Sequence, residues 1–254
     1  MKKNFQRWMC RIGMALLAVV VSAGLASCGN DDDDNGGGSF AKGKRLVSIA
    51  EIENYTTETT FTYGADGKLA KATSGNTTDE FAWGENSINI TEHYSRYEDD
   101  KTFVSLANNK ISSYIAGSGE EGSCTYSGNM LVKAPYSEYT WGNGNITKFK
   151  TGDDDTYTCT YYTDKVNKHP IVDIEALRLY YAIGGLEYGD EWLLVAHPSL
   201  IGTTNKNLLK SVVRNDGWTR SYEYELDKDG YPTKIVETYG YPNDNKTTYI
   251  ITWE

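Results

Sequence analysis

Three stretches of the sequence repeat one short plan, and this repetition constrains the fold more than any other feature. The stretches are TTFTYGADGKLAKAT, YTWGNGNITKFK and YEYELDKDGYPTKIVET, with a slipped fourth copy in CTYSGNMLVKA. In each, an aromatic strand end leads to a turn that closes on glycine and then to the pattern Gly-x-apolar-x-Lys. The matched positions are Gly67, Leu69 and Lys71; Gly144, Ile146 and Lys148; and Gly230, Pro232 and Lys234. Such internal similarity, with period-two alternation around a turn, indicates a repeated β-hairpin.

The copy at residues 139–150 illustrates the unit. Asn143-Gly144 suits a two-residue turn that needs positive φ angles. The resulting cross-strand pairs are Gly142 with Asn145, Trp141 with Ile146, Thr140 with Thr147, and Tyr139 with Lys148. Pairs of these types stabilise a sheet without any ligand. We therefore interpret the aromatic residues as scaffold and expect the face that carries Trp141 to point into the core.

The same alternation runs through most of the chain after residue 44. The predicted strands are 45–53, 58–64, 68–73, 77–83, 87–94, 101–106, 110–115, 121–126, 130–134, 137–141, 145–150, 155–162, 207–214, 218–225, 233–239 and 246–253. We therefore predict a mainly β protein. Its hairpins would form a long antiparallel meander, with a curved or barrel-like sheet.

One segment breaks the period-two pattern. The stretch VDIEALRLYYAIGG predicts a helix over about 172–184, with Asp173 as its N-cap and Gly184-Gly185 as its stop. The following residues up to Pro198 predict an irregular or short helical stretch. A curved sheet has a concave face to cover. We expect the helix, with Trp192, Leu193 and Leu194, to cover that face or plug one end; the alternative is a lid over a pocket.

Residues 1–27 are typical of a secretory signal peptide, with a basic start, an apolar run and the exit LASC. A transmembrane anchor would need a longer apolar run. LASC resembles the lipobox of bacterial lipoproteins, in which the cysteine, here Cys28, is acylated and becomes the new N-terminus. The predicted domains are the signal peptide at 1–27, lipidated Cys28 with an acidic, glycine-rich tether at 28–43, and a single β-hairpin-repeat domain at 44–254.

An acidic run follows the cysteine and consists of Asp31, Asp32, Asp33 and Asp34. It resembles the surface-export signal of Bacteroidetes lipoproteins, which implies the outer membrane and an orientation toward the cell surface. The hairpin plan resembles the YD (Rhs-type) repeats. Together with the leader, it resembles a family of Bacteroidetes lipoproteins of unknown function with a porin-like, curved β-meander. That family implies no established activity, so no catalytic residue is carried over.

Charge narrows the choice of partners. The formal net charge is −10, and removing the four basic residues of the leader leaves 21 basic against 35 acidic residues, about −14. Such a chain is a poor partner for nucleic acid, whose phosphates require cationic contacts. Many strands are polar on both faces and the mean hydropathy is −0.55, whereas a transmembrane barrel needs an apolar outer face. We expect a monomer that contacts the membrane through its N-terminal lipid.

No pattern marks a catalytic, cofactor or metal site. His93, His169 and His197 are far apart in the sequence, and no nucleophile, P-loop or dinucleotide motif is present. We therefore predict no enzyme activity, no cofactor and no metal. In a simple meander Cys124 and Cys159 lie four strand spacings apart, roughly 19 Å, which exceeds the reach of a disulfide. They are expected to be free structural thiols unless the sheet closes on itself.

Three functions remain open at this point. The first is a non-catalytic surface protein that binds glycan or another extracellular ligand, with Trp83 and Trp218 as candidate ligand-binding residues. The second is a structural or assembly partner of an outer-membrane complex. The third is a hydrolase, which would require two carboxyl groups roughly 5–10 Å apart in a cleft.

Overall fold

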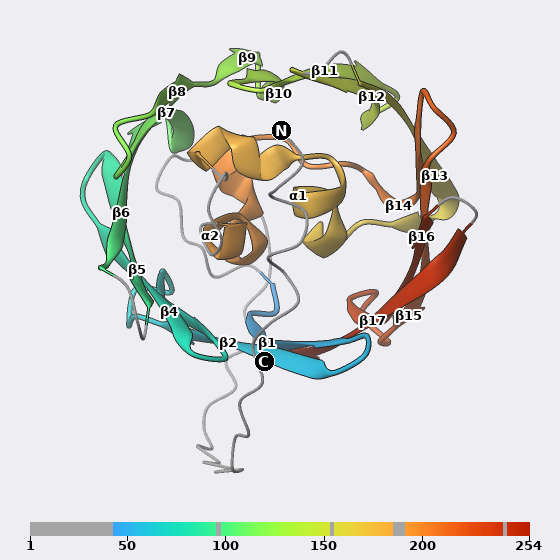
Figure 1. The fold of residues 1–254 in the computed structure, drawn as a ribbon, viewed down its shortest axis with the longest axis horizontal. Coiled ribbons are helices and arrows are strands. Elements are labelled where there is room, and N and C mark those ends of the chain that lie inside the picture. The colour runs from blue at the N-terminus through green and yellow to red at the C-terminus, as the bar shows by residue number, and fades with distance from the viewer. Residues whose placement is uncertain (1–42, 95–97, 153–154, 185–190, 241–242) are drawn as a thin grey trace, which may run out of the picture. The chain divides into compact units, whose positions relative to one another are not determined.

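A computed structural model of the protein describes residues 43–94, 98–152, 155–184, 191–240 and 243–254. The described chain forms one sheet of 17 strands, which surrounds a group of short helices (Figure 1). The predicted mainly β meander with a barrel-like sheet is therefore confirmed. The predicted leader and tether, including Cys28 and Asp31 to Asp34, lie outside the described residues.

The strands follow one another in chain order. They are β1 (Leu46–Ile52), β2 (Thr56–Tyr63), β3 (Leu69–Ser74), β4 (Thr77–Trp83), β5 (Ser87–Tyr94), β6 (Asp100–Ala107), β7 (Lys110–Ala116), β8 (Glu121–Ser123), β9 (Thr125–Ser127), β10 (Met130–Ala134), β11 (Ser137–Gly142), β12 (Asn145–Thr151), β13 (Thr156–Val166), β14 (Asn207–Arg214), β15 (Thr219–Leu226), β16 (Pro232–Gly240) and β17 (Asn243–Trp253).

The sheet closes because the last strand pairs with the first. Ile49 of β1 lies opposite Ile251 of β17, in an antiparallel register like that of the neighbouring strands. A closed antiparallel ring needs an even number of strands. The 17 strands meet this requirement because two of them, β8 and β9, are separated only by Cys124. This residue interrupts the strand predicted over 121–126, so that β8 pairs with β7 and β9 pairs with β10. The two pieces run in line and act as one strand of a nearly closed ring, in which, among the described strands, β8 pairs only with β7 and β9 only with β10.

Alternate connections of a meander lie at the same end of the barrel. We call one end the near rim: it carries the repeat turns with Gly67, Gly144 and Gly230, and Arg45 and Glu254 exchange backbone hydrogen bonds there. The opposite end is the far rim. Its connections include residues 53–55, 75–76, 117–120, 135–136 and 215–218.

The long connection between β13 and β14 enters from the near rim and fills the barrel (Figure 1). We call its described residues, 167–184 and 191–206, the plug. It contains α1 (Ile171–Ala176), the 3₁₀ turn η2 (Leu179–Ile183), α2 (Glu191–Ala196) and the 3₁₀ turn η3 (Pro198–Ile201). Leu193 and Leu194 are fully buried. The expectation that this segment packs inside the sheet is confirmed.

The predicted single helix over 172–184 is divided in two. Arg178 adopts a left-handed conformation, with φ 57° and ψ 31°, and separates α1 from η2. Its carbonyl accepts a hydrogen bond from the hydroxyl of Tyr139 on the wall, at 3.0 Å. The prediction that Asp173 is the N-cap is wrong. Pro170 holds that position, and Asp173 lies within α1. Gly184 does end the segment, with φ 93°.

Apolar residues of the strands point inward against the plug. Leu69, Ile88, Val104 and Ile146 are almost completely buried. The outer face is polar, and the repeat lysines form cross-strand ion pairs on it: Lys71 with Glu80, Lys133 with Glu138, and Lys234 with Glu225. No helix among the described residues is long and apolar enough to cross a bilayer.

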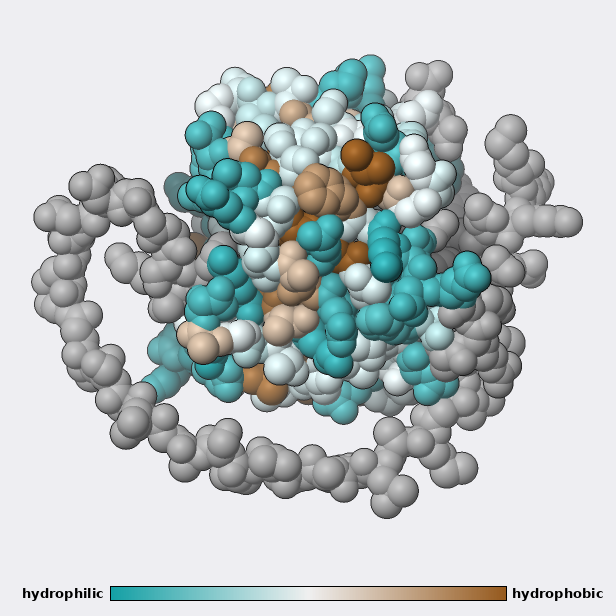
Figure 2. All heavy atoms as spheres, turned by 90° about the vertical axis from the view of Figure 1, so that its left-hand side faces the viewer, coloured by the Kyte–Doolittle hydropathy of each residue, from teal (hydrophilic) through white to brown (hydrophobic). Residues whose placement is uncertain are grey.

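One part of the outer wall is less polar. Figure 2 looks onto the side of the barrel where β5, β6 and β7 lie, and its mainly hydrophilic surface carries a small hydrophobic patch. Phe103 of β6 and Ile115 of β7 are directly paired in the ladder and are 40% and 46% exposed.

The hairpin at 139–150 differs from the prediction in its register. Trp141 does face Ile146 and Gly142 faces Asn145, but a bulge follows. Thr140 therefore lies opposite Lys148, and Tyr139 opposite Phe149; the predicted pairs of Thr140 with Thr147 and Tyr139 with Lys148 are wrong. The extra residue, Thr147, bonds the carbonyl of Thr140 at 3.2 Å. The shift brings Phe149 rather than a lysine beside Tyr139 in the core.

The same bulge recurs at the near rim and explains the repeat aromatics. In each case an extra residue follows the apolar position of the repeat, as Ala70 follows Leu69. The carbonyl of that apolar residue accepts a hydrogen bond from an aromatic side chain on the next strand. These bonds, at 2.6–2.9 Å, join Trp83 to Leu69, Tyr126 to Ile111, Trp141 to Leu131, Tyr161 to Ile146, Tyr224 to Leu209, and Trp253 to Pro232.

One hairpin lacks both parts of this arrangement. The β4–β5 register runs without a bulge, and Trp83 pairs with Ile88 there. On β6 the position that elsewhere carries the aromatic donor is Leu106, which pairs with Ile111 and has no polar tip. The bulge and the aromatic donor thus occur together, which supports the interpretation of the repeat aromatics as scaffold. Trp141 packs against the core, as predicted.

Both cysteines are free, as expected, although the sheet closes. Cys124 lies at the β8–β9 break and Cys159 on β13, four strands along the wall. Burial raises the pKa of each thiol to about 12. Both are therefore unreactive thiols at neutral pH.

The bond from aromatic tip to bulge carbonyl can be tested by removing one hydroxyl. Tyr161→Phe should destabilise the protein by about 1–2 kcal/mol, because the buried Ile146 carbonyl loses its donor. Tyr136→Phe is the matched control, since its hydroxyl bonds Glu120 at the exposed surface, and should change stability by less than about 0.5 kcal/mol. Urea unfolding measures both. Equal losses for the two variants would contradict this assignment.

Candidate functional site

The far rim brings together charged and aromatic side chains from distant parts of the chain. At its centre Arg220 of β15 lies 5.3 Å from the ring of Trp218 and 5.9 Å from the ring of Tyr239 on β16. Trp218 lies in the β14–β15 turn, where Arg214 is also 5.8 Å from its ring. The turn brings Trp218 beside Arg220, and the antiparallel pairing of β15 with β16 places Arg220 opposite Tyr239.

Arg220 ties the wall to the plug. Its Nε lies 3.0 Å from Glu237 of β16, and Nη1 lies 2.7 Å from Glu175 of α1. Glu237 is buried and also accepts a hydrogen bond from the Tyr249 hydroxyl at 2.9 Å. Burial raises the pKa of Glu237, while Arg220 opposes the rise. Burial lowers the pKa of Arg220, but the carboxylates of Glu175 and Glu237 act in the opposite direction. The net effect raises this pKa, so the guanidinium stays charged.

Acidic side chains gather around this ion pair. Burial raises the pKa of Glu51 at the end of β1 to about 7, and the nearby carboxylates of Glu175 and Glu237 add to the rise. Glu53 accepts a short hydrogen bond from the Tyr239 hydroxyl. Glu51 therefore titrates near neutral pH, which makes the charge of this part of the rim sensitive to pH.

A second group of rings at the far rim connects the plug to the β10–β11 turn. Tyr181 of η2 lies 5.3 Å from Tyr136 and 4.7 Å from Tyr180, both edge to face. Tyr136 is 37% exposed, and its hydroxyl bonds Glu120 at 2.6 Å. We call Tyr136, Tyr180, Tyr181, Trp218 and Tyr239 the far-rim aromatic band. Arg178, next to η2, donates a hydrogen bond to the Tyr180 hydroxyl at 2.5 Å.

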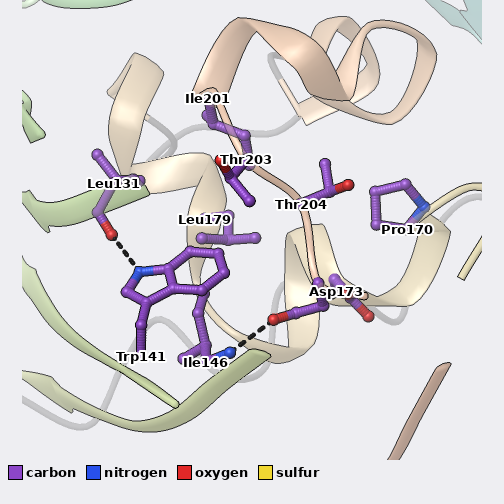
Figure 3. A pocket seen from close by; sticks show the side chains of 10 residues that line it. Leu131, Trp141, Ile146, Pro170, Asp173, Leu179, Ile201, Thr203 and Thr204 are labelled. Carbon is purple, nitrogen blue, oxygen red and sulfur yellow. Dashed lines mark hydrogen bonds between the residues drawn. The ribbon is translucent and has the colours of Figure 1, made fainter. Parts of the chain in front are cut away.

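One small cavity lies inside the described part of the barrel. A cavity of about 10 Å³ lies between the plug and the near rim, lined by Trp141, Asp173 and Asn205 among others (Figure 3). That volume holds about one water molecule. The carboxylate of Asp173 accepts hydrogen bonds from the amides of Asn205 at 2.7 Å and Asn167 at 3.2 Å. Burial raises its pKa to about 7.

The candidate ligand-binding tryptophans lie at opposite rims. Trp83 belongs to the near rim, where its indole bonds Leu69 and packs edge-on against His197 at 5.3 Å. Trp218 belongs to the far rim and faces two arginines. The structure therefore does not bring them into one site. Trp83 has a scaffold role, while Trp218 belongs to the aromatic band.

Sequence reasoning missed Tyr136, Tyr180, Tyr181, Arg178 and Arg220. The tyrosines of the plug stood out only as part of a predicted helix, and Arg220 carries no motif. These residues meet because the meander closes and the plug crosses the barrel. Local sequence predicts neither the closure of the sheet nor the path of the plug.

The histidines take separate structural places. His197 is buried and its Nε2 accepts the Leu69 backbone amide at 2.8 Å, while His169 lies 5.0 Å from the ring of Trp253. Burial lowers the pKa of each to about 4. His93 lies 2.9 Å from Asp99 at the surface. Within the part of the chain that the structure describes, no group of three or more metal-ligating side chains is found.

The fold is similar to that of solved proteins, although the sequence matches no family model and no curated protein. A porin-like protein from Bacteroides uniformis has a TM-score of 0.55 and 15% identity, over 82% of this chain and 98% of that one. A porin-like protein from Bacteroides vulgatus has a TM-score of 0.55 and 13% identity, over 84% of this chain and 99% of that one. At such identities the likeness establishes a shared fold.

The ion pair between wall and plug predicts a pH-dependent defect. Arg220→Met leaves Glu237 buried without its cation and should destabilise the protein by about 3–5 kcal/mol. The pKa of Glu237 in the folded variant then lies further above its unfolded value. A raised carboxyl pKa stabilises the fold at low pH and loses that contribution as pH rises through the folded pKa. The loss should thus be larger at about pH 8 than at about pH 5.5.

Thermal unfolding at the two pH values checks this prediction. The double variant R220M/E237Q should recover much of the lost stability, because it removes the unpaired buried charge as well. A defect that is equal at both pH values, or no recovery in the double variant, would contradict the role assigned to Glu237.

Proposed function

We propose that the protein is a non-catalytic, lipid-anchored protein of the outer membrane that faces the cell surface and binds glycan at its far rim. The far-rim aromatic band is the observation that carries this proposal. Its rings lie beside carboxylates and arginines, and flat rings with a few polar groups suit the alternating apolar and hydroxyl surfaces of sugars. The porin-like proteins of similar fold come from Bacteroides, which fits an outer-membrane location.

The filled interior directs this proposal to the rim. Leu177, Leu193 and Ile183 of the plug are fully buried against the wall, so the described barrel is packed like a protein core rather than open as a conduit. The ion pairs on the outer face would lose their solvation in hydrocarbon. Both features favour a tethered domain outside the bilayer.

The position of the first described residues gives the proposed domain a direction. Lys44 bonds Asp227 at 2.5 Å and lies over the Tyr231 ring at 5.5 Å, both in the near-rim turn between β15 and β16. A tether that begins at a lipidated Cys28 would therefore join the near rim. The far rim, with the aromatic band, is then the end away from the attachment point.

A structural role in an outer-membrane complex is the second candidate. The exposed pair of Phe103 and Ile115 on the outer wall favours it, since paired apolar side chains there could meet a partner protein. The patch is small and isolated on a polar wall, so we place glycan binding first.

Binding can be tested with a glycan array and two tyrosine variants. Tyr136→Ala and Tyr181→Ala should each weaken binding about three- to tenfold, because each removes a ring of the band. Phe103→Ala, which removes an exposed ring of the outer wall, is the matched control and should bind as the wild type does. An array without any bound glycan, or equal effects of all three substitutions, would contradict the proposal.

Anchoring is tested separately by metabolic labelling with a fatty-acid analogue. The wild type should carry the label and sediment with outer membranes, whereas Cys28→Ala should carry none. Replacing Asp31 to Asp34 by serine should keep the label but protect the protein from protease added to whole cells. Labelled Cys28→Ala protein would argue against this anchor.

A further inference from the structure

Arg178 holds an unusual position in the plug. It is one of four non-glycine residues with positive φ in the described chain, and the other three are asparagines in turns. Asparagine tolerates this conformation, while a long side chain there is strained. The hydrogen bond from Tyr139 to its carbonyl and the short elements on either side hold the backbone in place. Strain kept at one residue points to a use for its side chain.

The guanidinium of Arg178 has no carboxylate partner among the described residues. The three other arginines described all form ion pairs: Arg45 with Glu254 at 2.7 Å, Arg214 with Asp216 at 2.6 Å, and Arg220 with Glu175 at 2.7 Å. Arg178 instead donates to the neutral hydroxyl of Tyr180 and lies 5.9 Å from its ring. It is half-buried, so water solvates this charge only in part.

The nearby acids are already engaged. Glu175, three residues earlier, pairs with Arg220. Glu120 accepts hydrogen bonds from the hydroxyls of Tyr114 at 2.9 Å and Tyr136 at 2.6 Å. Burial is the largest effect on the pKa of Arg178 and lowers it, as does the nearby positive charge of Arg220, but Tyr180 and Tyr181 together raise this pKa by more. Arg178 thus remains a cation whose counter-ion has not been supplied by the described chain.

We propose that Arg178 recognises the carboxylate of an acidic sugar, with Tyr180, Tyr181 and Tyr136 contacting the sugar rings. A guanidinium binds a carboxylate through two parallel hydrogen bonds, which matches the geometry of a uronate group. The adjacent edge-to-face tyrosines provide ring surface on one side of the charge. This inference rests on the proposed glycan binding and narrows its ligand to carboxylate-bearing saccharides.

The overall charge of the protein favours a ligand with isolated carboxylates. The chain has a net charge of −10, and Glu51, Glu53 and Glu175 lie on the same rim, so a saccharide with several negative charges per sugar would be repelled more strongly than one with a single carboxylate per sugar. A saccharide with one carboxylate per residue can place that group at Arg178 and its neutral hydroxyls near the acids.

Calorimetric titration of the purified full chain tests the inference with three probes: an oligogalacturonate, its methyl ester, and a neutral malto-oligosaccharide of the same length. A glucuronate-containing oligosaccharide extends the acidic arm. The acid should bind at least roughly tenfold more tightly than its ester, because the ester cannot accept the paired charge-assisted hydrogen bonds. Arg178→Asn should abolish this preference, and asparagine keeps the left-handed backbone acceptable.

Arg45→Asn is the matched control, since it removes the same charge at the near rim, where Arg45 pairs with Glu254. It should keep the preference for the acid. Thermal unfolding should show R178N to be as stable as the wild type or more stable. Equal binding of acid, ester and neutral probe would overturn the carboxylate inference while supporting glycan binding. Binding of no saccharide would overturn both, and tighter binding of a peptide α-carboxylate than of any acidic sugar would overturn the choice of ligand.

Discussion

The hydrogen bond from an aromatic tip to the carbonyl beside a bulge is the interaction on which the rest of the barrel depends. Each bulge bends its strand and increases the local twist, which a closed sheet requires. It also leaves the local ladder irregular, and a buried carbonyl without a donor is unfavourable. The indole of Trp141 and the hydroxyl of Tyr161 supply that donor from the neighbouring strand. The same repeat therefore contains both the bulge that curves the sheet and the aromatic donor that satisfies the carbonyl beside it.

Closure then determines what the interior and the rims can do. A ring of this size encloses more space than its own side chains fill, and the insertion between β13 and β14 occupies that space. Arg220 fixes the insertion to the wall through Glu175 and Glu237. Because the interior is packed, a ligand would have to bind at the surface. The far rim is the part of the surface where plug and wall residues meet. The strained Arg178 and the ion-paired Arg220 are products of that meeting.

The parts of the fold that sequence could predict are those set by local chemistry. Asn143-Gly144 requires its turn, and alternation fixes which face of β11 is buried. The bulge at Thr147 could not be predicted from one hairpin, because an added residue reverses the facing of all that follow, here placing Phe149 opposite Tyr139. The break at Arg178 depends on a hydroxyl from the wall. The far-rim aromatic band depends on closure of the sheet, which brings together residues that no short motif connects. Of its residues, the sequence predicted only Trp218 as a candidate for ligand binding, and the other candidate, Trp83, lies at the near rim.

The pairing of β1 with β17 also sets an order of events in time. Ile49 and Ile251 are about 200 residues apart in the chain yet adjacent in the ring, so this contact carries a large loop-closure entropy and is expected to form late. Before β17 pairs with β1, the partly folded meander exposes two unpaired strand edges and an apolar face. Both favour aggregation with other chains. Unlike a repeat protein with an open end, this ring gains no stable stopping point as hairpins are added. Its last strand pairs with its first, so the folded state is complete only when this late pairing forms.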